Sequence, residues 1–154
     1  MSGGLSLLAR GAGAGALATV AMSAEMLAAQ RLGVMGEQPP ERIAEDAAEE
    51  VTGSQPDEGT TDVLASVAHF AFGAAGGAGY ALILGRSARS AGPVTGIVFG
   101  LLVWAASYAG WIPALGILPP PDRDRPGRQV AMVLAHVIYG SVLGALVGRS
   151  ARRF

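Results

Sequence analysis

The chain is 154 residues long, with a mean hydropathy of +0.41, 51% apolar residues, 15% charged residues and a formal net charge of -1. This composition excludes a disordered protein and an ordinary water-soluble domain, and the lack of cysteine excludes a disulfide scaffold and thiolate chemistry. The chain lacks the excess of basic residues that would indicate a nucleic-acid partner. We therefore expect residues 1–154 to form a single integral membrane domain that is embedded in the lipid bilayer.

Four long apolar stretches have no basic residue in their interiors. Each is close to the roughly 20 residues that a helix needs to cross a hydrocarbon core about 30 Å thick. No alternating pattern favours a β-barrel, so the backbone must be satisfied within helices. The sequence therefore predicts an all-α protein, a four-helix transmembrane bundle with helices at 11–30, 63–84, 93–115 and 130–148.

The first stretch, 11–30, follows Arg10 and contains Glu25. Its segment 21–24, Ala-Met-Ser-Ala, is also typical of the cleavage site of a secretory signal. The apolar run continues through 26–29, past such a cut, which favours a helix that stays in the membrane.

An acidic loop at 31–62, predicted to lie on the outer side, follows the first stretch. Within it, the apolar residues of 41–51 fall on one helical face and the acids on the other, after Pro39 and Pro40. This pattern predicts a short amphipathic surface helix. Because the helix is acidic, we expect it to cap the bundle or meet a partner rather than dock on anionic headgroups.

The second and fourth stretches share the pattern V-x4-A-H-x2-[FY]-G, at 63–73 and 130–140. Each follows a stretch with glycines four apart, which let helices approach closely in lipid. A duplicated helical hairpin explains both features, and chance similarity between alanine-rich helices is the alternative. The bundle is thus predicted to consist of two similar hairpins in parallel orientation, with self-association into a homo-oligomer through glycine-rich faces.

The third stretch ends in a proline-rich segment, 113–121, that cannot continue a helix. The following segment 122–126, Asp-Arg-Asp-Arg-Pro, is predicted to form solvated ion pairs near the surface.

The arginines near the helix ends predict the orientation. Arg10, the pair at 86 and 89, and the cluster 149–153 lie on one side of the membrane without any acid, whereas the arginines on the other side are mixed with Asp and Glu. We therefore expect both termini in the cytoplasm.

Three ionisable residues, Glu25, His69 and His136, fall at one predicted depth. At a rise of about 1.5 Å per residue, each lies roughly 21 Å from the cytoplasmic side, and Ser107 and Tyr108 reach the same level. Ionisable groups inside a membrane are candidates for function. We interpret the five residues as one polar constellation that binds a ligand or protons.

This constellation has several chemical interpretations. A carboxylate beside two imidazoles can relay protons or handle a small solute, and the same set, Glu25, His69 and His136, can bind a divalent metal. Alternatively, the two histidines are axial ligands of a b-type haem in a redox subunit, or they only pack and stabilise the helices of a structural or assembly partner that has no ligand. No nucleophile pair, phosphate loop or dinucleotide fingerprint indicates an enzyme, so we expect a non-enzymatic membrane protein that handles protons or a small solute without a cofactor.

The order of these features resembles the YagU-like bacterial inner-membrane proteins of unknown function. The resemblance implies a multi-pass protein of four helices in the bacterial plasma membrane and brings no established reaction. The positions that carry it are Glu25, Pro39, Pro40, Arg42, His69, Pro113, Gly116, Pro119, Pro120 and His136.

Overall fold

The computed structural model describes residues 2–36, 38–54 and 56–152, and over these residues the chain is helical without strands. Four helical spans are long and apolar enough to cross a membrane, which confirms the predicted all-α four-helix bundle. The main helices are α1 (Ser2–Arg31), α3 (Glu58–Leu84), α4 (Pro93–Ala106) and α6 (Pro126–Arg152).

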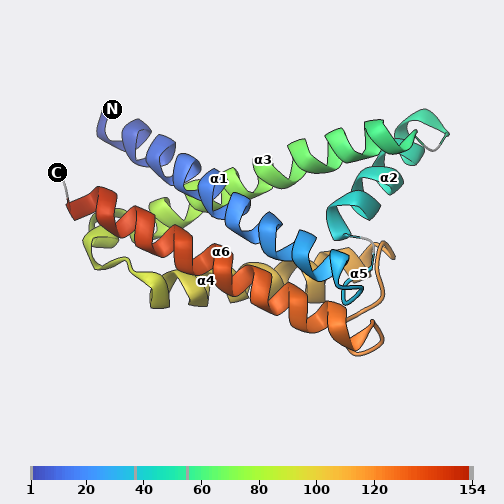
Figure 1. Cartoon of the computed structure of the whole chain (residues 1–154). Coiled ribbons are helices and arrows are strands. Elements are labelled where there is room, and N and C mark those ends of the chain that lie inside the picture. Colours follow the sequence, from blue (N-terminus) through green and yellow to red (C-terminus); the bar gives the residue numbers. More distant parts are fainter. Residues whose placement is uncertain (1, 37, 55, 153–154) are drawn as a thin grey trace.

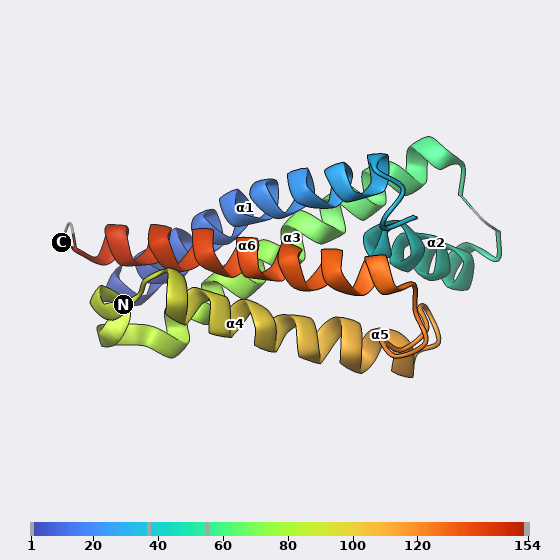
Figure 2. The same ribbon diagram turned by 60° about the horizontal axis from the view of Figure 1, so that its bottom comes forward.

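The helices pair in the order of the two predicted hairpins. Helix α1 packs along α3, α4 packs along α6, and the two pairs meet where α1 packs on α6. Both chain ends lie at one end of the bundle, together with the short 3₁₀ turn η1 (Gly85–Ser90), and we call this the termini end (Figure 1). The short helix α2 (Pro39–Thr52) lies at the opposite end, which we call the α2 end (Figure 2).

The membrane helices are longer than hydropathy predicted. Helix α1 begins at Ser2 instead of residue 11, and α6 runs from Pro126 to Arg152 instead of from 130 to 148. Helix α3 begins at Glu58 instead of residue 63, because the side chain of Asp57 accepts a hydrogen bond from the Thr60 N–H (3.1 Å) and caps the helix. Hydrogen bonds from Thr60 also hold the pKa of the Asp57 carboxyl below its usual range. At the start of α3, a capping side chain rather than the first apolar residue therefore sets the helix end.

The third membrane span is not one regular helix, contrary to the prediction for 93–115. Helix α4 is followed by a π-helical turn, η2 (Ser107–Trp111), and by the single turn α5 (Ile112–Ala114). Pro113 lacks the N–H that would continue the α-helical ladder, and its ring would clash with the carbonyl four residues earlier. The wider turn accommodates this proline.

Helix α2 forms where the amphipathic pattern was seen and is longer than predicted by a few residues. Its first turn is closed by a capping box, in which the Gln38 N–H donates to the Glu41 carboxylate (2.9 Å). Gly53 ends the helix with a left-handed conformation at φ 71°. Its buried residues include Pro39 and Ala44, and the helix packs on α3.

Glycines bring the helices of each pair into backbone contact in the half of the bundle nearer the termini end. A Cβ added to Gly15 of α1 would meet the Gly73 carbonyl and the Gly77 backbone of α3. The second pair has matching contacts, with Gly96 of α4 against the Gly140 carbonyl and the Gly144 backbone of α6. These contacts leave no room for side chains between the paired helices.

Candidate functional site

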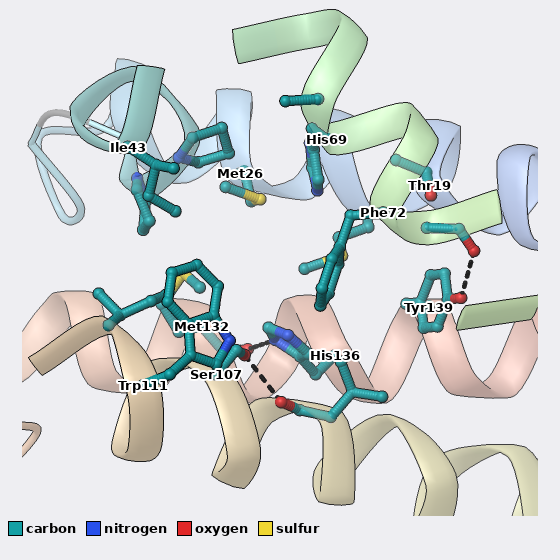
Figure 3. A pocket seen from close by; sticks show the side chains of 17 residues that line it. Thr19, Met26, Ile43, His69, Phe72, Ser107, Trp111, Met132, His136 and Tyr139 are labelled. Atoms are coloured by element: carbon teal, nitrogen blue, oxygen red, sulfur yellow. Dashed lines mark hydrogen bonds between the residues drawn. The ribbon is translucent and has the colours of Figure 1, made fainter. Parts of the chain in front are cut away.

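A cavity of about 170 Å³ lies between the helices in the half of the bundle nearer the α2 end, and we call it the inner cavity (Figure 3). It forms at the level of His69 and His136, where larger side chains line the space between the two helix pairs. Its walls are mostly apolar, with Met26 from α1, Phe72 from α3 and Ile112 from α5. Such a wall excludes water from most of the space.

Both histidines line the inner cavity, and Figure 3 shows His69 entering it from α3 and His136 from α6. Each lies four residues before a close-packed glycine, Gly73 or Gly140, and therefore on the same face of its helix as that contact. The shared sequence pattern thus places two imidazoles in one cavity.

His136 has a defined hydrogen-bonding state. It is 5% exposed, and its Nδ1 lies 2.8 Å from the Met132 carbonyl oxygen. Because a carbonyl oxygen only accepts, Nδ1 carries the proton, and Nε2 of the neutral ring is left as an acceptor. Among the described residues Nε2 makes no hydrogen bond, so it is available to a ligand.

His69 separates the inner cavity from a second, larger one. Its Nδ1 lies 3.5 Å from the Ser23 hydroxyl, which can donate or accept. The second cavity, of about 450 Å³, is bounded by α1, α2 and α3, and we call it the vestibule. His69 and Pro40 line both spaces, so the two cavities adjoin at these residues.

The vestibule is far more polar than the inner cavity, and its charged groups are acidic. Its described lining contains no arginine, and the exposed positions Asp62 and Ser66 place it at the α2 end of α3. Its polar lining residues are Ser23, Gln30, Gln38, Glu41, Asp62, Ser66 and His69.

Three hydroxyl groups also line the inner cavity, and each donates a hydrogen bond to a backbone carbonyl. Thr19 and Ser107 donate within their own membrane span, and Tyr139 of α6 donates to α3. Hydroxyls that donate in this way keep their lone pairs free to accept. The bonds run from Thr19 to the Gly15 carbonyl (2.9 Å), from Ser107 to the Val103 carbonyl (2.7 Å) and from Tyr139 to the Gly73 carbonyl (2.7 Å).

The structure brings together only some of the five residues that were predicted to form one polar site. His69, His136 and Ser107 share the inner cavity, whereas Glu25 and Tyr108 line neither cavity. The Glu25 Oε2 atom is buried and has no hydrogen-bond partner among the described residues. Tyr108 is fully buried, and its hydroxyl donates to the Asp124 carboxylate. Equal depth along four helices therefore did not predict which side chains meet, because depth says nothing about the direction in which each helix face points.

Part of the segment 122–126 also differs from its prediction as a set of solvated ion pairs. Asp124 is buried and pairs with Arg128 at 3.0 Å, and Arg128 Nε donates to the Met35 carbonyl (3.1 Å). Only Asp122 and Arg123 form an exposed pair, at 3.9 Å. The buried pair ties the start of α6 to the segment after α1.

The metal-ligating side chains and the volume of the inner cavity can be compared with what a metal ion or a haem requires. Within residues 2–36, 38–54 and 56–152, no group of three His, Asp or Glu side chains could hold a metal ion, so Glu25, His69 and His136 do not form the three-ligand set. The inner cavity is also smaller than the roughly 300–1,000 Å³ of a typical drug-sized ligand site. The porphyrin of a b-type haem does not fit it in this conformation.

Several lining residues were not singled out from the sequence. Tyr139 was visible as the aromatic position of the repeated pattern, and Thr19 continues the glycine row of Gly11 and Gly15. No sequence pattern pointed to Asp62 as a lining residue, because the vestibule forms only when α2 folds back onto α3.

A helical bundle with four membrane-length spans and an embedded cavity defines a multi-pass membrane protein. The chain belongs to DUF6789, a family of unknown function, whose model matches residues 5–153. Neither a curated protein nor a solved structure matches the chain.

Proposed function

We propose that this protein handles a small solute inside the membrane, with His69 and His136 as the groups that bind it and exchange protons. One arrangement carries the proposal: both imidazoles line a single cavity, and His69 also borders the vestibule. A solute at the α2 end can thus reach the inner cavity through the vestibule. Imidazole is the side chain whose ordinary pKa lies closest to neutral pH, so it suits proton exchange.

The glycine contacts make the site accessible from one end in this conformation. Beyond Tyr139, which donates to the Gly73 carbonyl, the helix pairs are in backbone contact towards the termini end. The solute therefore enters from the α2 end, and its release at the termini end requires the two helix pairs to separate where Tyr139 of α6 donates to the Gly73 carbonyl of α3.

Proton flux tests this function. Proteoliposomes that contain pyranine, with the membrane potential clamped by valinomycin and potassium, should lose an imposed pH gradient faster than protein-free liposomes. His136→Ala and His69→Ala should each lower the protein-dependent rate about tenfold or more, since they remove a proton-exchanging group. Leu134→Ala, at an exposed position of α6, is the control and should leave the rate unchanged. Wild-type rates in both histidine variants would contradict the proposal.

The site is proposed to work without a resident haem or metal, in keeping with the small cavity and the separation of Glu25 from the two histidines. The purified protein should then lack a Soret band.

The cellular setting is also part of the proposal. The acid-free arginine clusters near both termini support a cytoplasmic termini end and a vestibule that faces outward. The matching glycine contacts of α1–α3 and α4–α6 support a duplicated hairpin, and glycines with open space around them, such as Gly13 of α1 and Gly79 of α3, support a homo-oligomer. The resemblance to YagU-like proteins supports a bacterial plasma membrane.

A further inference from the structure

Four of the six side chains with polar atoms that line the inner cavity present acceptors to it. Thr19, Ser107 and Tyr139 donate their hydroxyl protons to backbone carbonyls, and His136 donates from Nδ1 to Met132. What these four groups present to a ligand is lone pairs. Two further side chains on this wall carry polar atoms: the indole N–H of Trp111 is a donor, and His69 can take either role, because its neighbour Ser23 is a hydroxyl.

A wall with four acceptors and few donors disfavours ligands that can only accept. A ketone, ester or carboxylate beside the hydroxyls or His136 would bury its oxygen against lone pairs, which costs the desolvation of that oxygen. A ligand with N–H or O–H groups meets partners instead. The inner cavity therefore favours an apolar molecule that carries hydrogen-bond donors.

The vestibule adds a preference for positive charge. Glu41 and Asp62 line it, and its lining contains no arginine among the described residues. A cleft lined by one sign of charge raises the local concentration of the opposite ion. Glu41 is held in place by the capping box with Gln38, so its carboxylate is fixed at the wall.

We infer that the solute is a small primary ammonium with a short apolar part, held in the inner cavity with its nitrogen towards His69, so that it meets the acceptors of this cavity on the side of the acidic vestibule. This inference rests on the proposed function, since it names the class of solute. A water molecule needs roughly 10–15 Å³ of such space, so a cavity of about 170 Å³ accepts on the order of ten non-hydrogen atoms. Hexylammonium matches this size.

The chain supplies its own reporter of binding. It has two tryptophans, of which Trp111 lines the inner cavity and Trp104 does not. Trp104→Phe leaves Trp111 as the single tryptophan of the chain, which excitation at the red edge of the tryptophan band selects over tyrosine. In nanodiscs of zwitterionic lipid at pH 7, hexylamine should change the Trp111 emission saturably, whereas empty nanodiscs and free tryptophan give no saturable signal.

Two probes of matched chain length separate charge from donor capacity. Hexanoate carries the opposite charge and no donor, and hexyltrimethylammonium carries the same charge without an N–H. Both should bind at least about tenfold more weakly than hexylamine, a difference of roughly 1.4 kcal/mol or more. Equal or tighter binding of either probe overturns the ammonium assignment, yet leaves a solute-binding cavity in place. No saturable response to any of the three probes overturns both the assignment and the proposed function.

A charge variant tests the vestibule. Asp62→Asn should weaken hexylamine binding about three- to fivefold, the size expected for an exposed charge. Glu50→Gln removes a charge from the exposed face of α2, outside the vestibule, and is the matched control. Equal affinities in the two variants would overturn the role of the vestibule, provided that circular dichroism shows both to be folded.

Discussion

At the scale of single residues, local hydrogen bonds decide what each polar group offers. The ring of His136 points its protonated nitrogen at Met132, and the hydroxyls of Ser107 and Tyr139 point their protons at carbonyls. Burial makes these bonds obligatory, because an unpaired donor in an apolar wall is costly. The chemistry of the inner cavity is therefore set by bonds that face away from it.

The buried pair of Asp124 and Arg128 leads to a prediction about stability. Arg128→Met should lower the free energy of unfolding by about 3–5 kcal/mol, because it leaves the Asp124 carboxylate buried without its cation. Arg123→Met, which removes an exposed partner, should cost about 1 kcal/mol or less. Denaturation of the detergent-solubilised variants, followed by circular dichroism, measures both.

A double variant provides a further check on this pair. Asp124→Leu combined with Arg128→Met removes both charges and should recover much of the lost stability. Equal destabilisation by Arg128→Met and Arg123→Met would mean that the buried pair contributes no more than the surface pair.

At the scale of elements, glycine determines where paired helices touch and where they separate. Close backbone contacts at Gly15 and Gly96 hold together the two helices of each hairpin near the termini end. One turn beyond Gly73 and Gly140 the helices carry His69 and His136 instead. The cavity lies between the two pairs at this level, although Gly100 of α4 still packs against the His136 carbonyl of α6.

Larger residues in the glycine rows should separate the helices. Gly15→Leu is expected to destabilise the protein by about 1–3 kcal/mol or more, because its side chain would collide with the α3 backbone. Gly13→Leu, on the same helix with open space around it, should be tolerated. Thermal unfolding in detergent compares them, and equal melting temperatures would show that the contact at Gly15 is dispensable.

At the scale of the whole molecule, the bundle is closed at the termini end and hollow at the α2 end. Backbone contacts between glycines close one half, and the inner cavity and vestibule occupy the other. If the termini are cytoplasmic, as predicted, the half that contains the cavities faces the outside of the cell.

The lack of cysteine in the chain makes this orientation testable by single-cysteine labelling. In intact bacterial cells, an impermeant thiol reagent should label Ser66→Cys in the vestibule and should not label Ser150→Cys at the termini end. Ala71→Cys, exposed on the apolar face of α3, is the lipid-facing control and should stay unlabelled. Labelling of Ser150→Cys alone would reverse the predicted topology.

The sequence by itself determined the class of protein and the number of membrane helices, because hydropathy and length act locally along each span. It also determined that His69 and His136 are equivalent in position, since each precedes a glycine on the same helical face. The tertiary structure alone decided that Glu25 and Tyr108 lie apart from these histidines and that Asp124 is buried. These outcomes depend on the rotation of each helix about its axis and on how the loops fold back, and both are set by packing between segments that are distant in the chain.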